Sequence, residues 1–402
     1  MATDAAVSQP RHTRPSRTVV ISNVPPTFNM RNFLALKGFG RPIESVIVHP
    51  DNKKVEISFL ERRSAELLAA AREKNEFALD GHELELEFVK PRPIPVEVIA
   101  AIGTREASRK IILNSLPKRD GKEGWTEKEL EEEMGRYGKV ESVWIDPQNG
   151  QKATVVFADI LQAVKASKTL RIEEAYKDSG VRFYSDVTLK THLPESGEDG
   201  PHSVYLTGLP LDITPSRLLK DLNSVLVFER GEPLIRVNMV KNTAFLHFTY
   251  PSVAKLFYDS YHPTRGVSKS WAANDGVIHR KHIAAIRLGA TRTVYITDFN
   301  DPRINFDRLR TDFSKFGRLA HVYTDWDSRR AYVEFTDITS ACNAIDHIAE
   351  NNRNFSIYAG SRISFGKRIS HGQKHGNVSP LIIATVGSED TSAKPKKAAV
   401  VA

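Results

Sequence analysis

The sequence predicts an α+β protein made of four consecutive copies of a βαββαβ unit. A short strand pattern recurs four times, and each copy leads into a helical pattern and a second strand. The length of 402 residues, 40% hydrophobic and 26% charged, suits several globular domains. One strand of each unit also shares an inward-facing set of Val or Ala, an aliphatic residue and Phe. These sets are Val55/Ile57/Phe59, Ala153/Val155/Phe157, Ala244/Leu246/Phe248 and Ala331/Val333/Phe335.

The composition limits the classes of protein that fit. Lys and Arg number 57 against 49 Asp and Glu, so the net charge of +8 permits a polyanionic partner without requiring one. The single cysteine, Cys342, lies in a helical pattern and is expected to pack as a small hydrophobe, which excludes a disulfide framework and fits a reducing compartment. Residues 1–16 have no apolar core typical of a signal peptide, and no apolar run reaches the roughly 18 residues of a membrane span.

The first two units follow the pattern in order. In the first, a strand at 19–24 ends at Pro25, and a helix around Phe33 precedes strands near 46–48, 55–59 and 84–88. In the second, Thr126 and Glu129 form a capping box for a helix that Gly138 closes, and a further helix starts at Asp159. Its strands are expected at 111–113, 143–145, 153–157 and 181–183.

The third and fourth units follow the same order. Thr214 is expected to cap a helix whose first residue is Pro215, between strands at 204–209 and 241–248. The last strand of the third unit is placed near 267–272. In the fourth, a strand at 294–299 precedes a helix that ends at Gly317 and a strand at 328–335. The expected segments are a basic arm at 1–16, units at 17–90, 109–191, 202–273 and 291–368, linkers at 91–108, 192–201 and 274–290, and a tail at 369–402.

The linkers repeat as well as the units. Residues 99–102 and 283–286 both read Ile-Ala-Ala-Ile, and each is followed by a short basic segment before the next unit. This spacing indicates that a pair of units joined by a short helical linker was duplicated. Both linkers are apolar enough to dock, so we expect two linked pairs, each semi-rigid.

Two strands of the fourth unit carry a recognisable signature. The hexamer 294–299 has Tyr295 at its second place, and the octamer 328–335 has Tyr332 at its fifth. This arrangement resembles the RNA recognition motif (RRM), a ferredoxin-like βαββαβ domain. The resemblance implies that the four units are tandem RRMs, numbered RRM1 to RRM4 below.

The linkers extend the resemblance to a subfamily. Residues 271–273 (Trp-Ala-Ala), 289–296 (Gly-Ala-Thr-Arg-Thr-Val-Tyr-Ile) and 362–367 (Arg-Ile-Ser-Phe-Gly-Lys) are similar to segments of fungal four-RRM RNA-binding proteins related to the negative regulator of differentiation. The resemblance covers about residues 17–370. It implies mRNA binding and post-transcriptional regulation, in the cytoplasm or shuttling through the nucleus.

The outward residues of RRM3 and RRM4 predict where RNA would bind. Aromatic rings on a sheet face can each stack a base, at about 1–3 kcal/mol per base. Arginines and lysines near these rings would neutralise phosphates, and the arginines that end two linkers would line the path between paired domains. The predicted RNA contacts are Tyr205, Lys241, Thr243, Phe245, Arg292, Tyr295, Tyr323, Arg329, Arg330, Tyr332, Lys367, Arg368, Arg109 and Trp144.

RRM1 and RRM2 lack this ring pair. RRM1 has Val20 and Glu56 at the equivalent places, and the glutamates at 83, 85 and 87 would repel phosphate, which favours a solvated face or a protein contact. RRM2 has Ile112 and Thr154 there. Its one outward ring candidate, Trp144, could take a base, take a protein partner, or be packed.

No pattern predicts catalysis, a cofactor or a metal site, so the protein is not expected to be an enzyme. His371 and His375 are four residues apart but lack further ligands. The sequence therefore favours a protein that binds single-stranded RNA, with mRNA as the expected class. Two alternatives remain: a scaffold or adaptor that binds protein partners through the degenerate RRM1 or RRM2, and a splicing-related small-nuclear-RNA factor that would use the same surfaces as mRNA.

Overall fold

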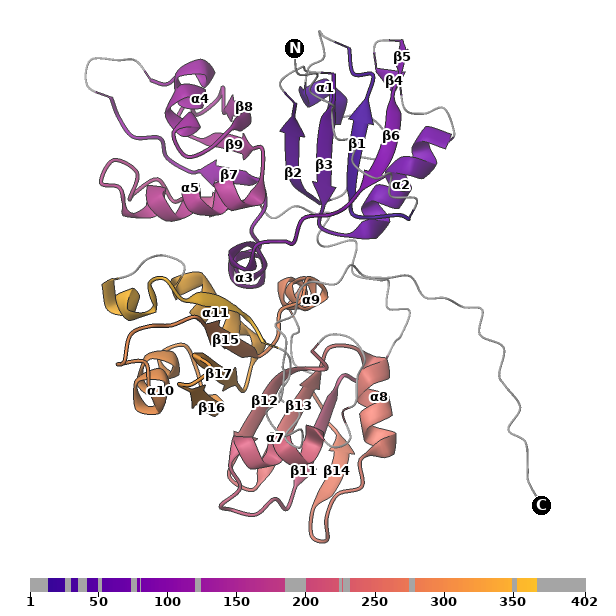
Figure 1. Cartoon of the computed structure of the whole chain (residues 1–402), viewed down its shortest axis with the longest axis vertical. Coiled ribbons are helices and arrows are strands. Elements are labelled where there is room, and N and C mark those ends of the chain that lie inside the picture. Colours follow the sequence, from indigo (N-terminus) through magenta and orange to yellow (C-terminus); the bar gives the residue numbers. More distant parts are fainter. Residues whose placement is uncertain are drawn as a thin grey trace, which may run out of the picture.

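The computed structural model contains four small α+β domains arranged around two central helices, α3 and α9 (Figure 1). Each domain has one four-stranded antiparallel sheet, and the strand order in space is second, third, first, fourth in all four. This order is that of an RRM, so the predicted fold class is confirmed. The structure describes residues 14–25, 30–34, 42–49, 53–73, 78–79, 81–119, 124–184, 200–223, 226, 232–274, 279–348 and 353–366.

The elements follow the predicted order. RRM1 contains β1 (Thr18–Ser22), α1 (Met30–Leu34), β2 (Ile43–Val48), β3 (Val55–Phe59), α2 (Arg62–Glu73), a small hairpin of β4 (Ala78–Leu79) and β5 (His82–Glu83), and β6 (Glu85–Val89). The linker helix α3 (Val96–Arg105) follows. RRM2 contains β7 (Lys110–Leu113), α4 (Glu127–Gly135), β8 (Val140–Ile145), β9 (Ala153–Phe157), α5 (Ile160–Ile172) and β10 (Arg182–Phe183).

The second half repeats this series. RRM3 contains β11 (Ser203–Thr207), α7 (Pro215–Asn223), β12 (Leu234–Val240), β13 (Thr243–Phe248), α8 (Pro251–Ser260) and β14 (Ser268–Trp271). The linker helix α9 (Arg280–Arg287) follows. RRM4 contains β15 (Thr293–Thr297), α10 (Phe306–Ser314), β16 (Leu319–Asp325), β17 (Arg330–Phe335), α11 (Ile338–Ile348), the 3₁₀ helix η1 (Arg353–Tyr358) and β18 (Arg362–Phe365).

Local sequence signals account for several helix starts. The Thr126 hydroxyl accepts a hydrogen bond from the Glu129 amide, and the Glu129 carboxylate accepts one from the Thr126 amide, which is the predicted capping box. The Thr214 hydroxyl accepts from the Arg217 amide at 3.2 Å. All four inward sets named above are buried, with the period-two pattern placing them under the helices.

The domains within each pair touch through an equivalent contact. In RRM1 the Val46 amide of β2 donates to the Ala158 carbonyl just after β9 of RRM2, at 2.8 Å. In RRM3 the Val237 amide of β12 donates to the Thr336 carbonyl just after β17 of RRM4, at 2.7 Å. In each pair, the second strand of the first domain therefore forms a backbone hydrogen bond with the second domain. The two pairs are joined in the same way.

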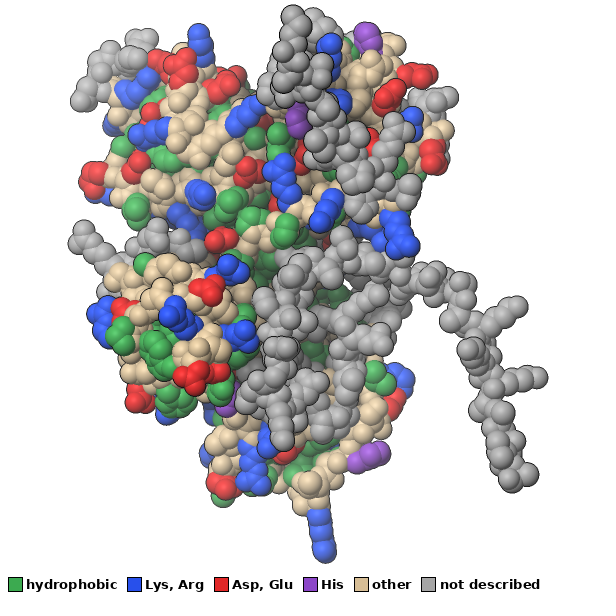
Figure 2. All heavy atoms as spheres, in the orientation of Figure 1, with side chains coloured by type: hydrophobic (Ala, Val, Ile, Leu, Met, Phe, Trp, Pro, Cys, Tyr) green, Lys and Arg blue, Asp and Glu red, His purple; other side chains and the backbone are tan. Residues whose placement is uncertain are grey.

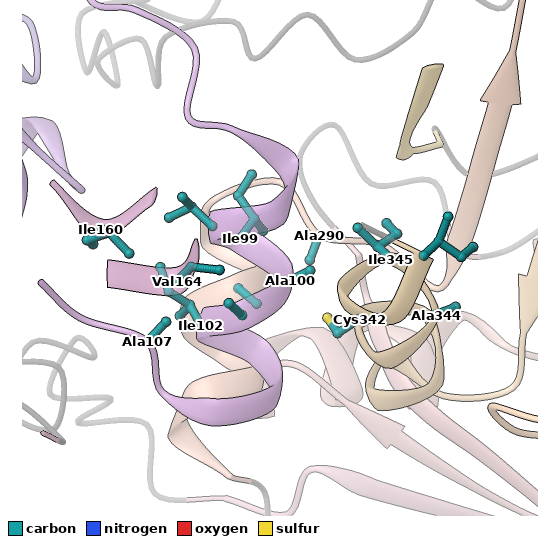
Figure 3. Close-up of a cluster of buried hydrophobic side chains, with 14 of the residues drawn as sticks. Ile99, Ala100, Ile102, Ala107, Ile160, Val164, Ala290, Cys342, Ala344 and Ile345 are labelled. Atoms are coloured by element: carbon teal, nitrogen blue, oxygen red, sulfur yellow. The ribbon is translucent and has the colours of Figure 1, made fainter. Parts of the chain in front are cut away.

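The pairs are also joined to each other, which the sequence did not predict. Helix α3 packs against α9, against α11 of RRM4 and against α5 of RRM2. Figure 3 shows its side chains between Ile160 and Val164 on one side and Cys342 and Ile345 on the other. One continuous apolar core thus includes α3, α9, RRM2 and RRM4.

Gly103 permits a close approach of helices in this core. A Cβ atom added to Gly103 would lie 2.7 Å from Cys342 Sγ and 3.1 Å from Ala285 Cβ, so a side chain there would push α3 away from α11 and α9. Cys342 is fully buried and free, as expected of a small hydrophobe. Burial raises the pKa of its thiol.

Polar contacts surround the same junction. The Asp346 carboxylate of α11 accepts hydrogen bonds from Arg105 of α3 at 2.9 Å and forms an ion pair with Lys168 of α5 at 2.9 Å. The Lys281 ammonium of α9 donates to the Thr104 carbonyl at 2.8 Å. These contacts connect RRM2, RRM4 and both linker helices, while the strand-edge bonds described above tie RRM1 to RRM2 and RRM3 to RRM4.

Candidate nucleic-acid interface

Strand register places one residue from each strand in a row across the outer face of every sheet. The four rows can be compared position by position, because the strands pair in the same way in each domain. From the second strand to the fourth, the rows are Ile47, Glu56, Val20, Glu87 in RRM1; Trp144, Thr154, Ile112, Arg182 in RRM2; Asn238, Phe245, Tyr205, Ser270 in RRM3; and Tyr323, Tyr332, Tyr295, Ser364 in RRM4.

RRM3 presents its two predicted rings together. Tyr205 and Phe245 are register partners, and their ring centroids lie 4.4 Å apart. Both rings are half-buried, so part of each faces solvent. The neighbouring Asn238 is exposed, which leaves that side of Phe245 open. The two ring planes are tilted by 33° to each other, and together they offer an apolar surface on which a base can stack.

The turn before β13 carries a cation. Lys241 is exposed and has a φ of 52°, a left-handed conformation that residues other than glycine adopt at some cost. The Asn242 carbonyl accepts from the Leu209 amide, which holds the turn beside the end of β11. The hydroxyl of the half-buried Thr243 donates to the Val240 carbonyl at 2.8 Å. Lys241 thus lies in the turn at the end of the sheet whose face carries the two rings.

RRM4 has the same ring pair, but the rings are buried. Tyr295 and Tyr332 are register partners that stack with centroids 4.6 Å apart, and Tyr323 lies 6.2 Å from Tyr332. Tyr295 is only 3% exposed and Tyr332 8%. Burial, followed by a hydrogen bond with Tyr295, raises the pKa of the Tyr332 phenol. The predicted face is right, but the expected exposure of these two rings is wrong.

The cations of RRM4 have mixed environments. Arg329 is exposed at a φ of 49°, in the turn before β17, and donates to the Asn300 side chain at 2.6 Å. Arg330 is half-buried at the start of β17, opposite Asp325 and Thr297. Trp326, an exposed ring in the same turn that the sequence analysis did not select, packs edge-on against Phe299. Lys367 and Arg368 lie outside the described residues.

The linker arginines Arg109 and Arg292 do not line a path for RNA. Arg109 is largely buried, where its guanidinium pairs with Glu141 and donates to the Phe157 carbonyl. Arg292 is fully buried and donates to the Phe335 carbonyl at 3.1 Å. The expectation that these two side chains contact RNA is therefore corrected.

A recurring structural role explains these arginines. Each stands directly before the first strand of its domain, and Arg17 of RRM1 makes the equivalent contact with the Phe59 carbonyl. In RRM1 and RRM2 the partner carboxylate, Glu44 or Glu141, comes from the bulge at the start of the second strand. An arginine before the first strand with a glutamate near the second strand is the sequence signal that identifies this role.

RRM4 completes the arrangement with a residue from another domain. Ala320 occupies its bulge, so Arg292 instead pairs with Glu232 of RRM3 at 3.3 Å and with Glu334 of β17 at 3.5 Å. Burial by itself would lower the pKa of Arg292, but the two carboxylates raise it. This buried triad ties RRM3 to RRM4.

The rows of RRM1 and RRM2 lack central rings, as expected. In RRM1, Glu56 forms an ion pair with Arg92 at 3.3 Å, and Glu85 and Glu87 are exposed on β6. In RRM2, Trp144 is 46% exposed rather than packed. Basic and acidic side chains are interspersed over the face shown in Figure 2.

Other site classes find no support in the described part of the chain. None of its helices is long and apolar enough to cross a bilayer. Among the same residues, His, Cys, Asp and Glu side chains form no cluster of three that could hold a metal ion. His371 and His375 lie outside the described residues.

Comparisons with known proteins find two curated fungal proteins that are similar to this chain. The chain is 24% identical to the Meiotically up-regulated gene 24 protein of Schizosaccharomyces pombe, over 82% of this chain and 53% of that protein. It is 23% identical to the RNA-binding protein MRN1 of Saccharomyces cerevisiae, over 88% of this chain and 66% of that protein. The chain is similar to fungal RRM-containing RNA-binding proteins over most of its length. It spans between about half and two thirds of the length of these relatives.

Comparisons with family models and with solved structures add little information about this chain. No family model matches the chain. Among solved structures, the three N-terminal RNA-binding domains of the yeast splicing factor Prp24 are 15% identical, covering 65% of this chain and 99% of that one, with a TM-score of 0.16. A score this low supports no argument about how the domains are arranged.

Proposed function

We propose that this protein binds single-stranded RNA, with mRNA as the target class, and that the sheet of RRM3 is its principal base-stacking surface. The observation that carries the proposal is the adjacent, half-buried Tyr205–Phe245 ring pair, on a sheet whose end carries the exposed Lys241. Stacking on such rings is tolerant of sequence, and a nearby cation attracts the phosphate backbone. The name of the relative MRN1 supports the same class.

RRM4 enters this proposal in a second role. Its ring pair is of the right chemistry, but Tyr295 and Tyr332 can stack bases only after the face opens. Arg329 and the exposed Trp326 lie at the end of the same sheet and are reachable without any such change. We therefore assign RRM4 phosphate contacts first and base stacking only on opening. Post-transcriptional control, in the cytoplasm or shuttling through the nucleus, remains the cellular role that this chemistry fits.

The test is RNA binding by full-length variants. The double substitution of Tyr205→Ala and Phe245→Ala should weaken binding to single-stranded RNA by at least 10-fold, since each stacked base contributes about 1–3 kcal/mol. Leu256→Ala is the matched control, because Leu256 is an exposed apolar residue on α8 of the same domain. Unchanged affinity in the double variant, or stronger binding to duplex RNA, would contradict the proposal.

A protein-binding role for RRM1 is the second candidate. Its outer row places Glu56 and Glu87 where the other domains carry rings, a hydroxyl or an arginine, and carboxylates there repel phosphate. A basic protein segment would suit this face. A partner that co-purifies after nuclease treatment and is lost when Glu85 and Glu87 are changed to Gln would support it, whereas loss of the partner on nuclease treatment would argue for RNA tethering.

A further inference from the structure

The outer face of RRM2 carries aromatic rings at its two edges instead of at its centre. Its row runs Trp144, Thr154, Ile112, Arg182, so the central places hold no ring. Trp144 on β8 is 46% exposed, and Tyr184, just after β10 at the opposite edge, is 40% exposed. Both rings are therefore open to solvent, one at each edge of the sheet.

The backbone fixes Tyr184 on the same face as Arg182. The buried Phe183 points into the core, so its neighbours on either side point outward. The Tyr184 amide donates to the Lys110 carbonyl at 2.9 Å, and its carbonyl accepts from the Ser108 hydroxyl at 2.9 Å. These bonds continue the sheet one residue beyond β10.

One cation contacts the Tyr184 ring, and two others lie on the same sheet. The Lys110 ammonium lies 4.6 Å from the centre of the Tyr184 ring, which places this charge on the outer face. Arg182 is exposed beside it, and Lys152 precedes β9 with the same outward parity as Thr154. The next row of the face, Ser142, Val156 and Lys110, also lacks an acidic residue. The carboxylate of Glu141 on β8 is engaged by Arg109.

We infer that the outer face of the RRM2 sheet is a second site for single-stranded RNA, in which Trp144 and Tyr184 each stack a base and Lys110, Lys152 and Arg182 hold phosphates. This inference rests on the proposed function, since it extends RNA binding to a domain without the usual ring pair. The rings stand on strands three spacings apart, or about 14 Å, so the site takes more than one nucleotide. RRM1 cannot act in this way, because Glu56 and Glu87 occupy its corresponding row.

The test uses the full chain and a fluorescent single-stranded RNA of random sequence, about 30 nucleotides long, so that it can reach beyond one domain. Trp144→Ala and Tyr184→Ala should each weaken binding by at least about 5-fold, the lower end of base–aromatic stacking. Trp144→Phe, which keeps a stacking ring, should restore most of the affinity. Ile172→Ala is the matched control, because Ile172 is highly exposed on α5 of the same domain.

The outcomes separate this inference from the proposed function. If the RRM3 double variant loses affinity and the two RRM2 variants do not, the RRM2 site is overturned and the proposed function stands. Loss in the RRM2 variants with no loss in the RRM3 variant supports the RRM2 site and removes RRM3. Normal binding by all variants overturns both. If Trp144→Ala instead releases a protein that survives nuclease treatment, the face binds protein and the inference is overturned.

Discussion

RRM3 and RRM4 carry the same ring pair at the same register, yet only one pair is accessible. Tyr205 and Phe245 are half-buried, whereas Tyr295 and Tyr332 are almost fully buried. One difference lies at the neighbouring place on the second strand, where RRM3 has the exposed Asn238 and RRM4 has Tyr323 beside Tyr332. The comparison teaches that strand period decides which face a ring occupies, while packing around it decides whether a ligand can reach it.

The largest expected effect comes from the triad that joins the two domains. Arg292→Ala would remove the buried cation that pairs with Glu232 and Glu334, so we expect a loss of about 3–5 kcal/mol in the free energy of unfolding. Denaturant unfolding of the full chain measures it. Arg303→Ala, which removes an exposed pair with Asp301, should change little. A small effect for Arg292→Ala would mean that RRM3 and RRM4 are not held together by this contact.

Substituting one ring of each pair should lower folding stability by different amounts. Because Tyr332 is buried, we expect its removal to cost about 3 kcal/mol of folding stability. Tyr205→Ala, at a half-buried position, should cost no more than about 1–2 kcal/mol. Thermal and denaturant unfolding of both variants provide the measurement. Equal losses would show that the difference in accessibility does not persist in solution.

Folding stability should depend on pH through His282 of the linker helix α9. Burial, followed by the charge of Lys281, lowers the pKa of His282 to about 4, and its ring lies 3.1 Å from the Thr339 hydroxyl of RRM4. The unfolded chain takes up this proton near pH 6.5, whereas the folded chain resists it. Stability should therefore fall by about 2–3 kcal/mol as the pH drops from about 6.5 to about 4.

A paired measurement isolates this contribution from carboxylate titration. His282→Asn removes the titrating ring, so its stability should fall less than that of wild type over the same interval. His262→Asn, at an exposed position on RRM3, should follow the wild-type curve. Parallel curves for wild type and His282→Asn would show that α9 does not bury its histidine against RRM4.

The smallest expected effect comes from exchanging the residue beside the ring pair between RRM3 and RRM4. Tyr323→Asn gives RRM4 the residue that RRM3 has at this place, and it should open one side of Tyr332. We expect single-stranded RNA affinity to rise a few-fold, within the 1–3 kcal/mol of one stacked base. Asn238→Tyr in RRM3 should act in the opposite direction. Affinities that move the same way in both variants would show that this position does not control access.

Much of the fold follows from local patterns. Alternation alone placed Ala331, Val333 and Phe335 in the core and Tyr332 on the opposite face, because side-chain direction in a strand has a period of two. The Thr126 capping box likewise depends only on residues three apart. The sites that were missed involve long-range contacts. Arg292 needs Glu232, 60 residues away in another domain, and no local pattern shows that pairing.

The ring exposures were less predictable for the same reason. Tyr323 was expected to join the face of RRM4, and it lies there beside Tyr332, but the burial of Tyr295 and Tyr332 does not follow from strand alternation. Tyr184 was missed, although its place two residues after Arg182 and next to the inward Phe183 shows its direction. Period-two alternation at the end of a short strand would have identified it.

The close contact at Gly103 has a consequence for ligand binding. Because α3 packs against α9, α11 and α5 around this point, RRM2 and RRM4 are joined through it in the absence of any ligand. An RNA strand held on the outer face of one domain then meets the outer face of the next domain at a high effective concentration. No entropy is lost in ordering a flexible tether between the domains. Gly103 would in this way influence the avidity of the whole chain while touching no ligand itself.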